Sequence, residues 1–236
     1  MIIGIMQPYF IPYIGYWQLM NAVDKYVVYD DVNYIKGGWI NRNRILMNGK
    51  PSYFNIPTIG ASPNKLINEV CVNNDKRLTN KNLRIIEAAY KKAPQFETIY
   101  PLVQEILEYD CTNIADYIFH SFTVINRYLD IKTELIMSSS LHKDNSLHGQ
   151  DKVIAICKEL NATEYYNAIG GQTLYSFEEF SKNKVQLKFL QTNDIFYKQF
   201  DNIYIGSLSI IDVLMFNNKD IVQQFLNEYS LIERSI

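Results

Sequence analysis

Short apolar runs alternate with segments of helical periodicity along most of the chain. The runs IIGIM and KYVVY, at residues 2–6 and 25–29, are apolar on both faces. This pattern is typical of central parallel strands that helices cover on both sides. We therefore predict strands there, and further short strands at residues 52–56, 67–72, 134–137, 164–167 and 185–190.

Apolar residues at helical spacing predict the remaining elements. Ile114, Ile118 and Phe122, for example, recur on one face of a predicted helix. The order of strands and helices predicts a doubly wound, mostly parallel, Rossmann-like α/β sheet in one domain, residues 1–236. A helical block at about residues 78–130 is predicted between the strands of this sheet, and we interpret it as a lid or a subdomain. The predicted helices are residues 11 or 13 to 22, 78–90, 98–109, 113–129, 151–160, 176–183, 208–216 and 220–229.

Polar residues follow the first two predicted strands directly. Gln7 comes after the first strand, and Asp30 and Asp31 come after the second. Ligands of open α/β sheets bind beyond the carboxyl ends of the strands. If the two strands are neighbours, these three side chains look into one crevice. In the alternative interpretation, residues 8–15 form an ordinary turn and the aspartates cap the next one.

The segment 31–44 is predicted to be a long polar loop, and long ordered loops are often functional. It contains Lys36, Trp39, Arg42 and Asn43. Arginine suits bidentate contact with a phosphate or carboxylate, which a sugar nucleotide or a phosphopantetheine arm would supply. A solvated surface is the alternative.

The second half of the chain offers a glycine pair and one histidine of interest. Gly170 and Gly171 follow a predicted strand, where they form either a ligand-binding turn with free N–H groups or a plain turn. No GxGxxG and no GxxxxGK[ST] occurs, which excludes standard dinucleotide and P-loop sites. No HExxH occurs, and no metal site is predicted. His148, just before a helix, is the histidine we select as a candidate acid or base.

Composition narrows the function classes. The net charge is −2 and no basic block is present, which argues against nucleic-acid binding. Three scattered cysteines and the lack of a leader sequence fit a reducing cytoplasm. No stretch approaches the roughly 20 apolar residues that a transmembrane segment needs. We expect a cytoplasmic protein.

The chain resembles the WbqC-like family, which is associated with gene clusters for bacterial surface polysaccharide, especially the O-antigen of lipopolysaccharide. It contains the stretches MQPYFIPYIGYWQL, DDVNYIKGGWINRNRI, GG after EYYNA, and SLSIIDVLMFN. The resemblance covers essentially the whole chain. It implies these candidate site residues: Gln7, Pro8, Pro12, Gly15, Asp30, Asp31, Lys36, Trp39, Arg42, Asn43, Gly170, Gly171, Tyr175, Ser209, Asp212 and Asn217.

A weaker resemblance is to nucleotidyltransferases of the HxGH type. The histidines that bind triphosphate in those enzymes are absent, and Tyr16 stands near the place of the second one. The resemblance therefore implies a related fold with altered chemistry. It rests on Phe10, Pro12, Gly15, Leu19, Ser207 and Ser209.

The leading functional hypothesis is a transferase of surface-glycan assembly. It would move an acyl or aminoacyl group from a thioester donor (coenzyme A, or phosphopantetheine on an acyl carrier protein) to an amino sugar or its sugar nucleotide. Asp30 or Asp31 would position or deprotonate the amine, and Lys36 and Arg42 would hold the donor phosphate. Two alternatives stay open: nucleotidyl transfer with ATP or CTP and Mg²⁺, and a non-catalytic scaffold. Tyr9, Tyr13 and Trp39 would stack on the sugar or acyl group.

Overall fold

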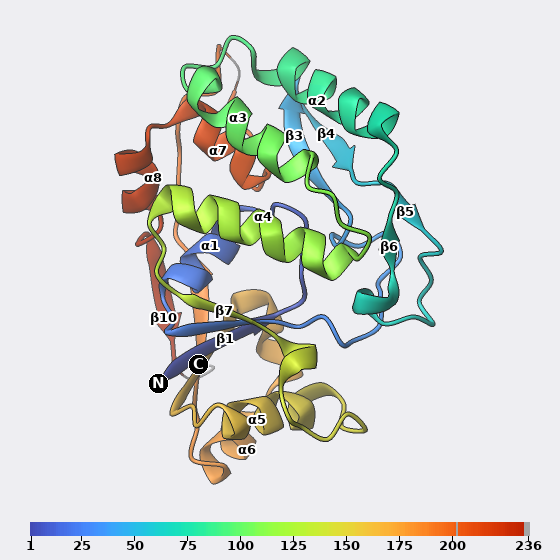
Figure 1. Cartoon of the computed structure of the whole chain (residues 1–236). Helices are drawn as coiled ribbons and strands as arrows, with labels where there is room; N and C mark the ends of the chain where they lie inside the picture. The colour runs from blue at the N-terminus through green and yellow to red at the C-terminus, as the bar shows by residue number, and fades with distance from the viewer. Residues whose placement is uncertain (202, 234–236) are drawn as a thin grey trace.

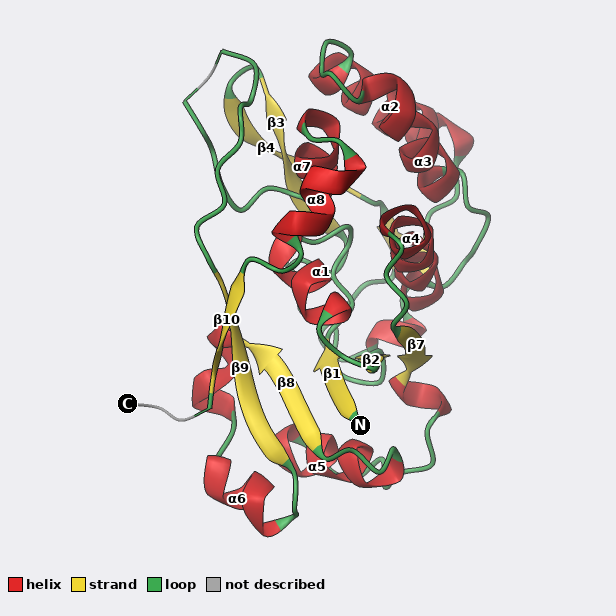
Figure 2. Ribbon diagram, turned by 90° about the vertical axis from the view of Figure 1, so that its left-hand side faces the viewer, coloured by secondary structure: helices red, strands yellow, loops and turns green. Residues whose placement is uncertain are grey.

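A six-stranded sheet in the order β10-β9-β8-β1-β2-β7 forms the base of the fold (Figures 1 and 2). The computed structural model describes residues 1–201 and 203–233. Five strands are parallel and β10 runs antiparallel to β9, so the doubly wound α/β prediction is confirmed. The strands are β1 (Ile2–Met6), β2 (Lys25–Val28), β7 (Glu134–Met137), β8 (Glu164–Ala168), β9 (Gln186–Thr192) and β10 (Tyr229–Ile232).

Helices cover both faces of this sheet. Ile3 and Ile5 of β1 point to one face, where they pack in a cluster with Val153 and Ile156. Tyr26 belongs to the larger cluster on the other face. The first face is covered by α5 (Gly149–Glu159) and α6 (Phe177–Lys182), and the second by α1 (Ile14–Asn21) and α4 (Ile114–Leu129). Helices α7 (Ile210–Phe216) and α8 (Lys219–Phe225) pack beyond these, α8 against α4 and α7 against α8.

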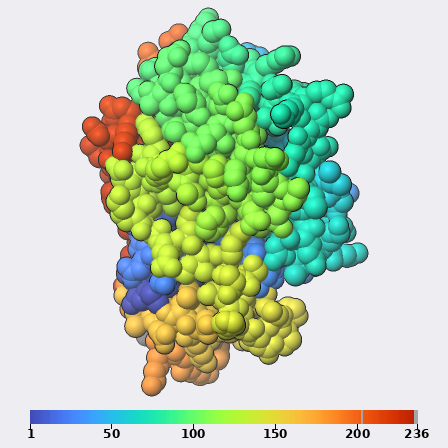
Figure 3. All heavy atoms as spheres, in the orientation of Figure 1, coloured from blue at the N-terminus to red at the C-terminus, as the bar shows by residue number. Residues whose placement is uncertain are grey.

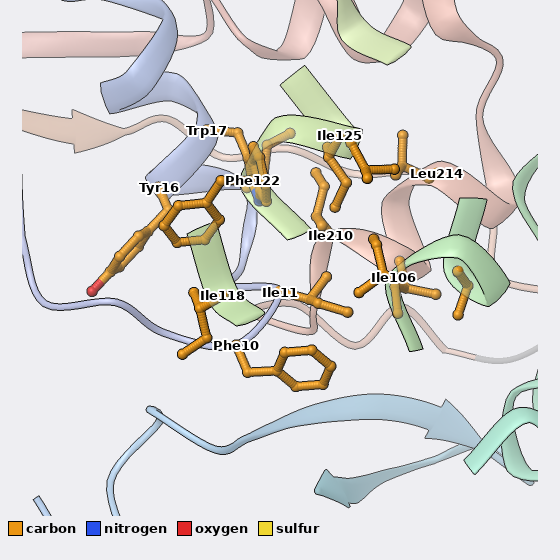
Figure 4. Packing of buried hydrophobic residues seen from close by; sticks show 14 of the residues in the cluster. Phe10, Ile11, Tyr16, Trp17, Ile106, Ile118, Phe122, Ile125, Ile210 and Leu214 are labelled. Atoms are coloured by element: carbon orange, nitrogen blue, oxygen red, sulfur yellow. The ribbon is translucent and has the colours of Figure 1, made fainter. Parts of the chain in front are cut away.

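The larger cluster joins the predicted helical block to the sheet. Trp17 of α1 meets Phe122 of α4 edge-on, with ring centroids 5.5 Å apart (Figure 4). Leu214 of α7 lies in the same cluster. The block, α2 (Lys76–Tyr90), α3 (Phe96–Leu107) and α4, thus shares its core with α1 and α7. In the space-filling view it forms the green upper part of the molecule, above the yellow and orange segments that follow residue 140 (Figure 3).

Two segments before the helical block differ from the sequence-based predictions in the elements they form. The loop predicted over 31–44 ends earlier, because β3 (Arg42–Met47) pairs with β4 (Lys50–Asn55) in a hairpin. Its turn is Asn48-Gly49, with φ of 51° and 72°, a pair that favours tight hairpin turns. Residues 67–72 form the 3₁₀ turn η1 (Ile67–Glu69) and β6 (Cys71–Val72), which pairs with β5 (Thr58–Ile59), instead of one strand.

The predicted last helix, 220–229, was too long. Helix α8 ends at Phe225, and Tyr229 begins β10. Strand β10 completes the sheet by pairing with β9, which is a long-range contact that local periodicity does not reveal. Over residues 1–201 and 203–233, no helix combines the length and the apolar character needed to cross a bilayer.

Candidate functional site

A pocket of about 300 Å³ lies beyond the carboxyl ends of β2 and β7. The 3₁₀ turn η2 (Ser138–Ser140) follows β7, and the amino end of α5 closes one side. This is the edge of the sheet at which the sequence predicts a site. Its walls include Tyr29, Asp31, Asn33, Asn68, Ser139, His148, Gly149 and Lys152.

Asp31 is held by two lysines in this pocket. Its Oδ2 lies 2.8 Å from Lys143 Nζ and 3.0 Å from Lys152 Nζ, and the lysine side chains are only 1% and 5% exposed. Burial raises the pKa of Asp31, but hydrogen bonds from Lys143, Ser138 and Lys152 outweigh it and hold the pKa below its usual value. Asp31 is therefore a charged partner of the lysines, and a carboxylate of lowered pKa is a poor general base.

Asp30 is buried directly before Asp31 and has different partners. It accepts hydrogen bonds from the Ser139 main-chain N–H at 2.9 Å, from Ser139 Oγ at 2.6 Å and from Asn68 Nδ2 at 3.1 Å. These bonds join the end of β2 to η2 and η1. Asp30 thus fixes the floor of the pocket.

The amino end of α5 faces the pocket without a side-chain cap. His148 occupies the N-cap position, makes no capping hydrogen bond and is exposed at the pocket wall. The first N–H groups of a helix carry partial positive charge and have no partner within the helix. Lys152, one turn further on, adds a buried ammonium. One wall therefore combines an imidazole, free N–H groups and a cation.

Several other predicted site residues support a turn next to the sheet. Ile11 has a φ of 41°, which a β-branched residue rarely adopts. Its carbonyl accepts hydrogen bonds from Asn43 Nδ2 at 3.1 Å and Ser209 Oγ at 2.7 Å. Asn43 also donates to the Phe10 carbonyl at 3.0 Å. Asn43 and Ser209 thus hold residues 10–11 in place.

Asp212 is a buried residue of α7, and Asn217 is the buried residue that directly follows this helix. Asp212 accepts hydrogen bonds from Tyr90 Oη at 2.8 Å, Tyr197 Oη at 2.7 Å and Gln199 Nε2 at 2.6 Å. Burial raises the pKa of Asp212, although these three bonds lower it in part. Asn217 donates to the Val213 carbonyl at the end of the helix. Asp212 thus holds neighbouring segments to α7, and Asn217 closes the end of the helix.

The glycine pair falls in the 3₁₀ turn η3 (Ile169–Leu174). A Cβ on Gly171 would lie 2.3 Å from Asn167 Oδ1, whereas one on Gly170 meets nothing within 4 Å. Close packing therefore accounts for Gly171. Tyr175 follows the turn and packs edge-on against Tyr165, with centroids 5.5 Å apart.

Gln7, Tyr9 and Tyr13 lie near the end of β1 and do not line the pocket that contains Asp31. Gln7 accepts a weak hydrogen bond from Tyr16 Oη at its carbonyl, and Tyr9 stacks on Tyr16 with centroids 5.1 Å apart. Of Gln7, Asp30 and Asp31, only Asp31 lines this pocket, so the predicted single crevice for the three side chains is wrong. Tyr13 meets the same ring edge-on.

Lys36, Trp39 and Arg42 gather at the β3–β4 hairpin, and Lys36 and Arg42 line a second groove there.

Three residues at the pocket, Lys143, Lys152 and Ser139, were not predicted from the sequence. One signal was available for Lys152, because it precedes the buried Ile156 by four residues and so lies on the apolar face of α5. Within the described ranges, no cluster of three or more His, Cys, Asp and Glu side chains is arranged to hold a metal.

Comparison with known proteins identifies the family. The sequence model of the WbqC-like protein family matches residues 7–224. The chain belongs to the WbqC-like protein family. A relative is the uncharacterized protein Rv1507c of Mycobacterium tuberculosis (strain ATCC 25618 / H37Rv), which is 26% identical over 217 residues; the match covers 90% of this chain and 92% of the relative. No solved structure matches this chain significantly.

Proposed function

We propose that this WbqC-like protein transfers an acyl or aminoacyl group from a thioester to the amine of an amino sugar, during assembly of a bacterial surface glycan such as O-antigen. The observation that carries the proposal is the wall of the 300 Å³ pocket, where His148, the uncapped amino end of α5 and the buried Lys152 adjoin one another. The association of the family with surface-polysaccharide gene clusters supports the choice of acceptor.

The proposed reaction needs one base and one site for a negatively charged oxygen. The sugar amine attacks the thioester carbonyl carbon, so that a C–N bond forms and the carbonyl oxygen becomes negative. Lys152 and the free N–H groups of α5 suit that oxygen, because preformed donors stabilise charge that develops in a transition state. The C–S bond then breaks and the thiolate leaves.

His148 takes the proton in this scheme. Histidine is the side chain best suited to exchange a proton near neutral pH. It accepts the proton that the attacking nitrogen loses and returns it to the departing thiolate, so the step balances. Asp30 and Asp31 are positioning residues here: Asp31 holds Lys143 and Lys152, and Asp30 holds Ser139. This assigns the base to His148 in place of either aspartate.

The test is a transfer assay with acyl- and aminoacyl-pantetheine thioesters and a panel of free and phosphorylated amino sugars, read by mass spectrometry. His148→Gln should lower kcat by about 10²–10⁴-fold, the range for loss of a general base. His142→Gln is the matched control, because His142 is exposed and lies outside the pocket wall. Full turnover by His148→Gln contradicts the assigned base, and lack of product with every amine contradicts the transfer.

A further inference from the structure

A second groove lies between the β3–β4 hairpin and α2, away from the pocket at the sheet edge. Its volume is about 840 Å³, which suits a small molecule. We call it the hairpin groove. Its walls include Tyr34, Lys36, Arg42, Tyr53, Asn55, Thr58, Lys81 and Asn82.

The hairpin groove is positively charged. Lys36, Arg42 and Lys81 line it, and its described lining contains no Asp or Glu. None of these three cations forms an ion pair with any residue of the described ranges. On a chain of net charge −2, three unpaired cations in one groove favour an anionic ligand.

An aromatic surface adjoins these cations. The Arg42 guanidinium lies 4.6 Å from the centroid of the Tyr53 ring, and Trp39 lies beside the same ring, with centroids 6.2 Å apart. The Arg44 guanidinium lies 5.5 Å from the centroid of Trp39. The hairpin pairs Arg44 with Tyr53 and Arg42 with Asn55. Because side chains alternate between the two faces of a strand, these four side chains lie on the same face of the hairpin. Tyr53 is nevertheless 56% exposed.

We propose that the hairpin groove binds the nucleoside diphosphate part of a small molecule. The base stacks on Tyr53, and the diphosphate lies against Lys36, Arg42 and Lys81. Arginine and lysine bind phosphate oxygens, and an exposed aromatic ring stacks with any nucleobase. An inorganic anion would use the cations and make no use of the exposed aromatic surface of Tyr53. This proposal concerns binding alone and assigns no reaction to the groove. It is therefore independent of the proposed acyl transfer.

Two kinds of metabolite carry this group. Coenzyme A contains an adenosine diphosphate with an additional 3′-phosphate and a pantetheine arm, and many sugar nucleotides contain a diphosphate joined to uridine or guanosine. The base, the 3′-phosphate and the pantetheine arm together distinguish them. The side chain of Asn55 is exposed at the groove and can contact the edge of a base, while Asn82 Nδ2 is engaged by the Asn55 carbonyl at 3.0 Å.

Isothermal titration calorimetry on the full chain tests the proposal, with ADP, coenzyme A, UDP, GDP, uridine and inorganic pyrophosphate as probes. We expect a nucleoside diphosphate to bind more tightly than either uridine or pyrophosphate, and more weakly as salt rises. Tyr53→Ala should weaken it by about 30-fold, the middle of the range for loss of one base stack. Tyr109→Ala is the matched control, because Tyr109 is partly exposed but belongs to another cavity.

The charge of the groove is tested in the same way. Lys36→Gln and Lys81→Gln should each weaken binding and reduce its salt dependence. Lys92→Gln removes the same charge from an exposed position outside the groove and should change nothing. Tighter binding of coenzyme A than of ADP and the other nucleotides identifies the source as coenzyme A, and tighter binding of UDP or GDP than of ADP and coenzyme A identifies it as a sugar nucleotide.

Three results would overturn the proposal. These are no heat with any nucleotide at millimolar concentration, equal affinity for pyrophosphate and the nucleoside diphosphates, or unchanged affinity in Tyr53→Ala. The transfer assay described above uses pantetheine thioesters and sugars without nucleotide. Failure of the transferase proposal and failure of this one therefore give separate results.

Discussion

Lys152 Nζ lies 3.0 Å from Asp31 Oδ2 and donates a hydrogen bond to the main-chain carbonyl of the same residue at 2.7 Å. One side chain of α5 thus holds both the carboxylate and the backbone that follow β2. Lys143 contacts the same carboxylate oxygen at 2.8 Å. These contacts join three segments that are far apart in the sequence.

We expect Lys152→Met to destabilise the protein by about 3 kcal/mol. Removing one partner of a buried ion pair costs roughly 3–5 kcal/mol, and Lys143 still compensates part of the Asp31 charge. Urea unfolding measures the change. The control is Lys182→Met, which breaks exposed pairs with Glu178 and Glu179 and should cost much less, because exposed ion pairs contribute little to stability. Equal losses in the two variants would contradict the structural role of Lys152.

Asn43→Ala should cost about 2 kcal/mol. It removes the hydrogen bonds to the Phe10 and Ile11 carbonyls, and although the Ile11 carbonyl keeps its bond from Ser209, a buried acceptor left without a partner, here the Phe10 carbonyl, costs roughly 1–3 kcal/mol. Urea denaturation checks this value. Asn55→Ala, at an exposed position on the neighbouring strand, should stay within about 0.5 kcal/mol of the parent. If Asn43→Ala loses less than about 0.5 kcal/mol, Ser209 alone is sufficient to hold the turn at residues 10–11.

Asp212 should make stability fall as pH rises above its unfolded-state pKa, near the ordinary value of 3.8. Burial raises the pKa of Asp212 in the folded state. Between the unfolded-state pKa and this raised pKa, the folded protein therefore binds more protons than the unfolded protein, and the free energy of unfolding decreases as the pH rises. In Asp212→Asn the fall should disappear. Unfolding free energies from pH 4 upward, measured for both proteins, give the difference curve. A flat difference curve would exclude the raised pKa.

The two adjacent glycines should tolerate alanine very differently. Gly171→Ala places a Cβ 2.3 Å from Asn167 Oδ1, and that side chain is held by the Ile5 carbonyl at 3.2 Å. Overpacking of this kind costs roughly 1–3 kcal/mol. Gly170→Ala meets open space and should change stability by less than about 0.5 kcal/mol. Thermal unfolding of both variants compares them, and similar melting temperatures would contradict the packing role of Gly171.

The pattern of apolar residues was sufficient to predict the five parallel strands of the sheet and most helices. Residues 2–6 and 25–29 form neighbouring parallel strands, and Ser176 accepts a hydrogen bond from the Glu179 N–H at the start of α6. These features depend on local periodicity and capping, which are properties of adjacent residues. The prediction also placed polar residues at the correct edge of the sheet. It did so because parallel strands end at the same edge.

Tertiary structure decided which of those residues share a site. Lys143 and Lys152 reach Asp31 only because β7 pairs with β2 and α5 packs across the sheet. Asp212 and Asn43 look like site residues in the sequence, yet the fold turns them toward other protein groups. Strand β10 depends on its contact with β9. Such contacts join residues far apart in the sequence, so local preference leaves them undetermined and the packing of the whole chain selects them.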